Sequence, residues 1–122
     1  MRERILLIDD DIAVLRTLEI VLSDRGYDIL TAKDGVEGLR VFRSARPDLV
    51  ITDLIMPEKE GIETIVEMRR ERPEAKIIAI SGGGRTHNIG FLDIAATLGA
   101  SAVLAKPFTP DQLAQKIDEV TR

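Results

Sequence analysis

Residues 4–11 of the chain read RILLIDDD, an arginine and four aliphatic side chains followed at once by three aspartates. An apolar run this short, bounded by polar residues, is typical of a strand that is buried on both faces of a parallel sheet. Residues 49–53 read LVITD and have the same pattern, a short, mostly aliphatic run that ends in an aspartate. The two stretches therefore predict two buried strands, each with carboxylates where it ends.

Short apolar runs of this kind alternate with amphipathic stretches along the whole chain. This alternation is expected of β–α units around a parallel sheet. Between the first two runs, Val14, Leu18 and Leu22 follow a helical period. A barrel needs eight such units and roughly 250 residues, so we expect an open, doubly wound α/β sheet. Five strands are expected, at residues 4–9, 28–31, 48–53, 76–81 and 102–104.

Several residues mark where the predicted helices begin and end. Thr109-Pro110-Asp111-Gln112 has the pattern of a capping box with proline at the first helical position. Asp34 and Glu37 form a weaker start signal. Gly26 and Gly99 stand where helices should stop.

The composition limits what the protein can be. With 122 residues, the chain has room for one domain. The absence of cysteine excludes thiol catalysis, zinc–thiolate sites and redox switching. The chain has 17 Lys and Arg residues against 21 Asp and Glu residues, and its net charge of −4 argues against direct binding to nucleic acid.

No membrane segment or signal peptide is expected. The apolar run of residues 5–8 is far shorter than the roughly 20 residues of a membrane-spanning helix. Three aspartates follow it directly, which does not fit the apolar region of a signal peptide. We therefore expect a cytoplasmic protein with no membrane partner.

The predicted strand ends carry polar residues that suit a single site. In open parallel sheets, ligands bind beyond the carboxyl ends of the strands. Carboxylates that meet there repel one another, and Mg²⁺, which prefers oxygen ligands, would keep them ionised. An ionised aspartate is then able to attack a phosphoryl group, and a lysine and a serine are able to bind the phosphoryl oxygens. The candidate residues are Asp9, Asp10, Asp11, Asp53, Ser81 and Lys106.

Each candidate also fits a plainer role. Residues 9–11 fit the cap of the first helix, and Asp53 fits a polar strand exit. Ser81 precedes three glycines and fits a turn, and Lys106 fits a solvated surface lysine. Their joint occurrence at four strand ends is what favours one magnesium and phosphoryl site.

Three segments resemble the motifs of the response-regulator receiver domain of two-component signalling, and the match covers essentially the whole chain. Ile5 to Asp11 resembles the first strand with its acidic pair, residues 48–57 with Gly61 resemble the phosphorylation-site segment, and Leu104 to Phe108 resembles the lysine segment. The resemblance implies a flavodoxin-like fold with five parallel strands in the order 2-1-3-4-5. It also implies a single receiver domain, residues 1–122, with no output domain in this chain.

The resemblance assigns the metal and acceptor roles. It makes Asp53 the phosphoacceptor, and Asp9 and Asp10 the acidic pair, with Asp10 the more direct Mg²⁺ ligand. Asp53 would share the metal, and Ile55 would bind it through the backbone carbonyl. Mg²⁺ is therefore the expected cofactor.

The resemblance also assigns the residues that follow the last two strands. Ser81 would be the switch hydroxyl that turns toward the phosphoryl group, and Lys106 would be the counter-ion of that group. The bond between Lys106 and Pro107 is expected to be cis, as is typical of the family.

Two features depart from the family pattern. Val103 stands where members commonly carry Tyr or Phe, so we expect a readout by loop and helix displacement and not by a moving ring. The segment after Ser81 is longer than usual and begins with Gly82 to Gly84. These glycines fit a flexible loop, and an anion-binding nest or a partner contact is the alternative. His87 is expected to be a surface residue of that loop.

The implied function is a signalling switch. A histidine kinase or phosphotransfer protein would transfer a phosphoryl group from its phosphohistidine to Asp53, which would change binding to a downstream effector protein. The domain would be no enzyme beyond catalysing its own phosphorylation and slow dephosphorylation. Ile55 and Gly83 stand two residues after Asp53 and Ser81, and neither has a polar side chain that could orient a hydrolytic water. We therefore expect a long-lived phosphorylated state. A homodimer through the fourth helix, fifth strand and fifth helix is common in the family.

Two other functions stay open. Residues 9–11 also match the Asp-x-Asp start of aspartate-nucleophile phosphohydrolases, although Ala13 stands where that pattern has Thr and no acidic pair follows Lys106. The second alternative is a pseudo-receiver, which binds partners without phosphorylation. The complete set of acids, serine and lysine disfavours it.

Overall fold

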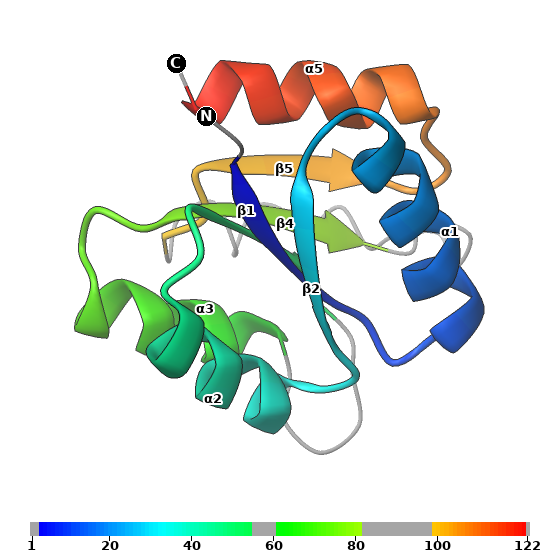
Figure 1. Cartoon of the computed structure of the whole chain (residues 1–122). Coiled ribbons are helices and arrows are strands. Elements are labelled where there is room, and N and C mark those ends of the chain that lie inside the picture. Colours follow the sequence, from blue (N-terminus) through cyan, green and yellow to red (C-terminus); the bar gives the residue numbers. More distant parts are fainter. Residues whose placement is uncertain (1–2, 55–60, 82–98, 122) are drawn as a thin grey trace.

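A computed structural model describes residues 3–54, 61–81 and 99–121 of the chain, with the backbone alone at Ser81. These residues form five strands and four helices (Figure 1). The strands are β1 (Arg4–Ile8), β2 (Asp28–Ala32), β3 (Leu49–Asp53), β4 (Lys76–Ser81) and β5 (Ala102–Ala105). The helices are α1 (Ile12–Asp24), α2 (Gly35–Ala45), α3 (Gly61–Glu71) and α5 (Pro110–Thr121). None of the helices in these ranges is long and apolar enough to cross a lipid bilayer.

The sheet confirms the predicted topology. All four strand pairs are parallel, and the strand order is β2-β1-β3-β4-β5. Helices α1 and α5 cover one face of the sheet, and α2 and α3 cover the other (Figure 1). Because the strands are parallel, their carboxyl ends lie at one edge of the sheet, where the candidate residues were expected to meet.

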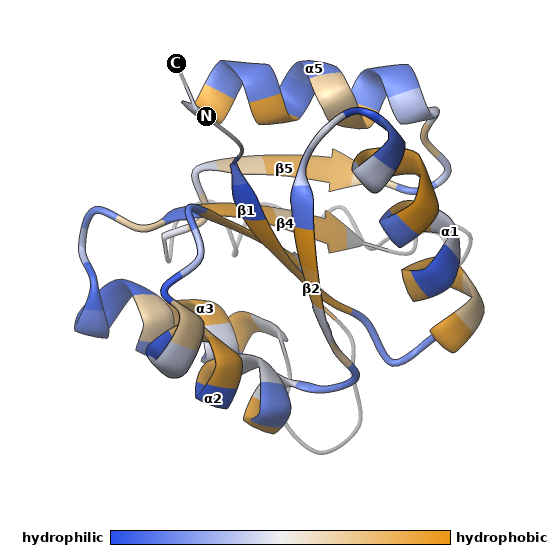
Figure 2. Ribbon diagram, viewed as in Figure 1, coloured by the Kyte–Doolittle hydropathy of each residue, from blue (hydrophilic) through white to orange (hydrophobic). Residues whose placement is uncertain are grey.

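Alternate residues of each central strand pack against opposite helical layers. In β1, Leu6 and Ile8 belong to the core that includes α2 and α3, whereas Ile5 and Leu7 belong to the core that includes α1 and α5. The sheet is therefore apolar on both faces, and the helices turn their polar residues outward (Figure 2). Each buried aliphatic side chain contributes roughly 1.5 to 3 kcal/mol to the stability of the fold, so the sheet holds the residues at its edge in fixed positions.

The strand bounds differ from the predicted ones by one residue at several ends. β1 ends at Ile8 and not at Asp9, because the Asp9 carboxylate accepts the N–H of Asp11 at 2.9 Å and turns the chain toward α1. The other differences are an end of β2 at Ala32, a start of β3 at Leu49 and an end of β5 at Ala105, whereas β4 has the predicted bounds.

The two predicted start signals cap helices, in slightly different ways. The N–H of Thr109 donates to Gln112 Oε1 at 2.8 Å, and the N–H of Gln112 donates to Thr109 Oγ1 at 3.1 Å, which is a reciprocal capping box. At α2, the Asp34 carboxylate accepts the N–H of Glu37 at 2.8 Å. The Glu37 carboxylate accepts the N–H of Lys33 and not that of Asp34, so this box is shifted by one residue.

Left-handed residues stand where chain segments turn. Gly26 follows α1 with φ 98°, as expected of a helix stop, and Gly99 has φ 133°. Arg46 ends α2 with φ 50°, a conformation that the sequence did not signal because the residue is not glycine. The predicted fourth helix falls in residues 82–98, outside the described residues.

Candidate functional site

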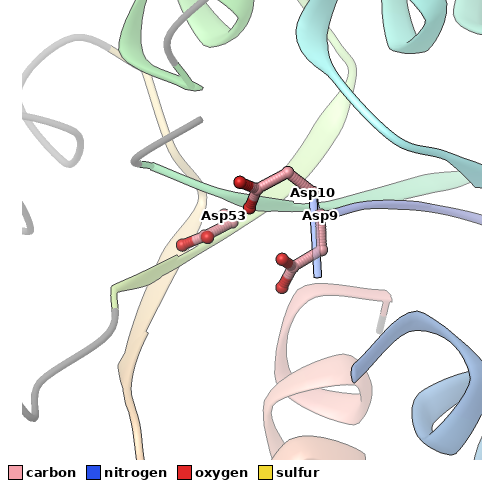
Figure 3. Close-up of side chains that lie close together, drawn as sticks. All are labelled: Asp9, Asp10 and Asp53. Atoms are coloured by element: carbon pink, nitrogen blue, oxygen red, sulfur yellow. The ribbon is translucent and has the colours of Figure 1, made fainter. Parts of the chain in front are cut away.

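The ends of β1 and β3 bring three aspartates together. Ligand oxygens of Asp9, Asp10 and Asp53 all lie within 4.8 Å of one another (Figure 3). Asp9 is 5% exposed and Asp53 is 8% exposed, whereas Asp10 is open to solvent. The structure thus assembles the carboxylate cluster that the sequence predicted, because β1 and β3 are neighbours in the sheet.

The three consecutive aspartates divide their roles. Asp11 is the N-cap of α1, and its Oδ1 accepts the N–H groups of Ala13 at 3.0 Å and Val14 at 3.2 Å. Asp9 points to the cluster, where its Oδ2 accepts a hydrogen bond from Lys106 Nζ at 3.3 Å. Asp11 therefore has the predicted capping role, whereas Asp9 and Asp10 belong to the carboxylate cluster.

The backbone around Asp53 is held on several sides. Asp53 Oδ1 accepts the N–H of Leu54 at 2.9 Å, and the fully buried Thr52 donates its hydroxyl to the Asp53 carbonyl at 2.9 Å. The N–H of Gly61, the first residue of α3, donates to the Leu54 carbonyl at 3.0 Å. A Cβ atom at Gly61 would overlap the carbonyl oxygen of Asp53 and lie 2.6 Å from the Leu54 Cα. The start of α3 therefore packs directly on the backbone of the candidate acceptor.

Burial and like charge control the ionisation of this cluster. Burial and, after it, the charge of Asp9 raise the pKa of Asp53 from 3.8 to about 6, and Lys106 opposes this increase. Burial also raises the pKa of Asp9, against the hydrogen bond from Asp11 and the charge of Lys106. One lysine does not neutralise three carboxylates. The oxygen donors and their unbalanced negative charge fit a hard divalent cation such as Mg²⁺.

The raised pKa of Asp53 predicts how stability depends on pH in metal-free buffer. A carboxyl with a higher pKa in the folded chain binds its proton more tightly there, so it favours folding at low pH. This contribution is lost as the pH rises from about 4 to about 6, and the pKa difference corresponds to roughly 2 to 3 kcal/mol. We therefore expect Asp53→Asn to exceed the wild type in free energy of unfolding, by a margin that grows over this range.

Urea denaturation of both proteins with a chelator present, at several values between pH 4 and 7.5, measures this margin. Titratable groups that do not interact with Asp53 cancel in the difference, so the margin reports Asp53 together with its coupling to Asp9 and Lys106. A margin that is the same at every pH would contradict the predicted ionisation of Asp53.

The remaining candidates lie at the same edge or outside the described residues. Ser81 is the last residue of β4 and pairs with Ala105 of β5, so its backbone reaches the site edge. Lys106 follows β5, and the Lys106–Pro107 bond is cis as predicted. The side chain of Ser81, and all of Ile55, Gly82 to Gly84 and His87, fall outside the described residues.

An apolar pocket, which the sequence did not reveal, borders Lys106. It has a volume of about 390 Å³ and lies between α1 and the segment that follows β5. The sequence gives little indication of this pocket, because the α1 residues that line it follow an ordinary helical pattern. The pocket is lined by Ala13, Val14, Thr17, Leu18, Lys106, Pro107 and Phe108.

Comparison with known proteins identifies the family. The family model described as "Response regulator receiver domain" matches residues 5–118. The chain therefore belongs to the response regulator receiver domains, the phosphoacceptor signalling domains of two-component systems.

Relatives of known sequence carry this domain within longer chains. The chain is 37% identical over 121 residues to "Probable transcriptional regulator ycf27" of Porphyridium aerugineum, covering 99% of this chain and 49% of that protein. It is 37% identical over 116 residues to "Transcriptional regulatory protein GlrR" of Escherichia coli (strain K12), covering 94% of this chain and 25% of that protein. The chain thus spans about half the length of the ycf27 relatives.

Solved structures of the family superpose closely. A response regulator receiver domain protein from Clostridium thermocellum has a TM-score of 0.89 at 32% identity, covering 97% of this chain and 93% of the other. The response regulator protein TrrA from Thermotoga maritima, solved in complex with Mg(2+)-BeF, has a TM-score of 0.85 at 33% identity and covers 98% and 99%. Both match nearly the full length of each chain.

Proposed function

We propose that this receiver domain takes up one phosphoryl group on Asp53, in the presence of Mg²⁺, from the phosphohistidine of a histidine kinase or phosphotransfer protein. The change would alter binding to a downstream effector protein. The observation that carries this proposal is the cluster of Asp9, Asp10 and Asp53 oxygens within 4.8 Å, with Lys106 hydrogen-bonded to Asp9.

The transfer is a simple displacement at phosphorus. An oxygen of the ionised Asp53 carboxylate forms the new P–O bond while the P–N bond to the donor imidazole breaks. The imidazole nitrogen leaves with the bonding electron pair and takes a proton from solvent. The product is an acyl phosphate on Asp53.

The residues around Asp53 suit the charge of the transferred group. Asp9, Asp10 and Asp53 would hold Mg²⁺, which supplies positive charge to the phosphoryl oxygens when it is bound. The similar protein TrrA was solved with Mg(2+)-BeF, which supports this choice of ion. Lys106 is near enough to exchange its Asp9 partner for a phosphoryl oxygen, as a point charge. The Ser81 hydroxyl and the Ile55 carbonyl are the further groups that we propose.

The apolar pocket beside Lys106 is where we place the phosphoryl donor. A donor protein must cover the site edge to bring a phosphohistidine to Asp53. The pocket lies directly beside that edge and offers apolar contact on α1 and around Phe108. An apolar side chain of the donor, packed in it, would orient the phosphohistidine.

We propose a readout that does not depend on a moving aromatic ring. Val103 is half-buried and packs against the core, so the ring that members commonly carry there has no equivalent. Movement of the backbone after Ser81 and of the neighbouring helix would change the binding surface instead. A cytoplasmic location and a homodimer through the fourth helix, β5 and α5 are parts of this proposal.

Uptake of phosphate from a small-molecule donor tests the proposal. Incubation with acetyl phosphate and increasing Mg²⁺, followed by intact mass measurement, should show one added phosphoryl group. After removal of the donor, the adduct should be lost slowly, because neither Ile55 nor Gly83 carries a polar side chain that could orient water.

The alternatives give different results in the same experiment. Release of phosphate over many turnovers would indicate a phosphohydrolase. The absence of any adduct at saturating Mg²⁺ would indicate a pseudo-receiver. Loss of the adduct within seconds would contradict the slow dephosphorylation that we propose.

A further inference from the structure

Strand β5 leads directly to Lys106, and in the described sheet it is hydrogen-bonded to a neighbouring strand on one side only. It has four residues, lies at the edge of the strand order and pairs with β4 alone. Lys106 follows its carboxyl end directly and must reach the aspartate cluster from there. Any shift of this short strand along β4 would therefore move Lys106 relative to Asp53.

One arginine is hydrogen-bonded to the segment just before the amino end of β5. Arg69, near the end of α3, donates from Nε at 3.1 Å and from Nη2 at 2.6 Å to the carbonyl of Gly99. Its Nη1 donates to the carbonyl of Pro73 at 2.7 Å and also to that of Ala75. All three nitrogens of the guanidinium are thus used, and they join α3 and the segment before β4 to the segment before β5.

The residues at the start of β5 complete this connection. Ser101 donates its N–H to the Ile77 carbonyl at 2.7 Å, and its Oγ accepts the Ile77 N–H at 3.1 Å and Arg69 Nη2 at 3.3 Å. Gly99 leaves room for the arginine, because a Cβ there would lie 3.2 Å from Arg69 Cγ. Ser101 therefore fixes the first pairing of β5 with β4, and Arg69 holds Ser101.

Helix α3 connects this contact with the acceptor. Its first residue, Gly61, packs on the backbone of Asp53, and Arg69 lies near its last residue, Glu71. The two ends of one helix thus contact the acceptor at one edge of the sheet and the start of β5 at the other.

We propose that Arg69 is a positioning residue for Lys106: it fixes the register of β5 from the amino end and so sets where the lysine stands beside Asp9 and Asp53. The effect acts along about 13 Å of strand, the length of four residues. This inference rests on the proposed function for its consequence in phosphoryl transfer, but the fixing of β5 is independent of it.

The chemistry of the contact requires arginine. The planar guanidinium reaches four acceptors at fixed angles, which a lysine ammonium on a flexible stem cannot do. Burial lowers the pKa of Arg69 and the charge of Glu74 opposes this decrease, while the carbonyls of Gly99, Pro73 and Ala75 accept its hydrogen bonds. We therefore expect Arg69→Lys to recover only part of the function, although it keeps the charge.

Hydrogen exchange tests the fixing of β5 without any phosphorylation. In Arg69→Met, amides from Ser101 to Lys106 should exchange about tenfold faster than in the wild type, while those of β1 should not change. Arg70→Met is the matched control, because Arg70 is the adjacent, exposed residue of α3, and it should leave all rates unchanged. Acceleration confined to Ser101, or equal acceleration in β1, would overturn the proposal.

A double-mutant cycle tests the action through Lys106. In the wild-type background, Arg69→Met should slow phosphorylation by acetyl phosphate about fivefold. In the background of Lys106→Ala, the same substitution should slow it less than about twofold. Equal slowing in both backgrounds would mean that Arg69 only stabilises the fold, and the proposal would fail. Ser101→Ala, a milder change at the same contact, repeats the cycle if Arg69→Met does not fold.

The two proposals fail in distinguishable ways. If the wild type takes up no phosphoryl group, the proposed function is wrong, and the exchange rates from Ser101 to Lys106 still decide whether Arg69 fixes β5. If the wild type is phosphorylated but the cycle is additive, the proposed function stands and the role of Arg69 does not.

Discussion

Replacing Asp53 with asparagine should abolish the uptake of a phosphoryl group. The amide nitrogen and oxygen of asparagine occupy the same space but lack the ionised oxygen that forms the acyl phosphate. We expect the rate of adduct formation, measured by intact mass with acetyl phosphate and Mg²⁺, to fall by at least about 100-fold. Unfolding does not explain such a loss, because the variant no longer carries the ionisation cost of a buried carboxylate.

Asp11→Asn is the matched control for this experiment. Asn is as good an N-cap as Asp, so α1 should keep its cap while one nearby negative charge is removed. We expect its rate of uptake to stay within about twofold of the wild type, since Asp11 holds the helix and not the cluster. Uptake of one group by Asp53→Asn at the wild-type rate would show that another residue, such as Asp10, is the acceptor.

Replacing Gly61 with alanine should strongly destabilise the domain. The new Cβ would overlap the Asp53 carbonyl oxygen and press on the Leu54 Cα, and both neighbours are backbone atoms of a buried strand end. Because these atoms cannot rotate away, we expect the free energy of unfolding to fall by about 2 to 4 kcal/mol. Urea denaturation measures the loss, and phosphate uptake should slow as well because Asp53 must shift.

Gly38→Ala is the control that separates a backbone clash from a side-chain clash. Gly38 is also buried and lies within α2, but the nearest atom to its added Cβ is Ile8 Cδ1, the far end of a flexible side chain, at 2.5 Å. Rotation of Ile8 and the better helix propensity of alanine should keep the change within about 1 kcal/mol. Equal losses in the two variants would contradict the tight contact of α3 with Asp53.

The central sheet and the carboxylate cluster could be predicted from sequence because both depend on local patterns. Runs such as ILLI and LVI identify strands buried on both faces, and a parallel sheet brings the strand ends to one edge. That geometry gives Asp53 and the run of residues 9–11, and the family resemblance selects Asp9 and Asp10 from this run. The capping box at Thr109 is also a local pattern, and it forms as predicted.

Contacts between distant residues could not be predicted in this way. In the sequence, Arg69 looks like one of several charged residues on a helix, and only the fold brings it to Gly99 and Ser101. The left-handed conformation of Arg46 has no signal, because arginine is uncommon there. The partner of Lys106 differs from the one that the family resemblance implies, for another reason. The resemblance pairs this lysine with the phosphoryl group of the phosphorylated domain, whereas in this structure of the unphosphorylated chain it is hydrogen-bonded to Asp9.

Helix α3 also limits how the length of this protein can vary. Each residue added to an α-helix turns everything after it by about 100° and moves it along the axis by about 1.5 Å. A single insertion between Gly61 and Arg69 would thus leave the glycine on the Asp53 backbone but swing the guanidinium away from Gly99. Functional variants of this chain should therefore accept insertions and deletions in surface loops far more readily than within α3, whose residue count is set by the two contacts at its ends.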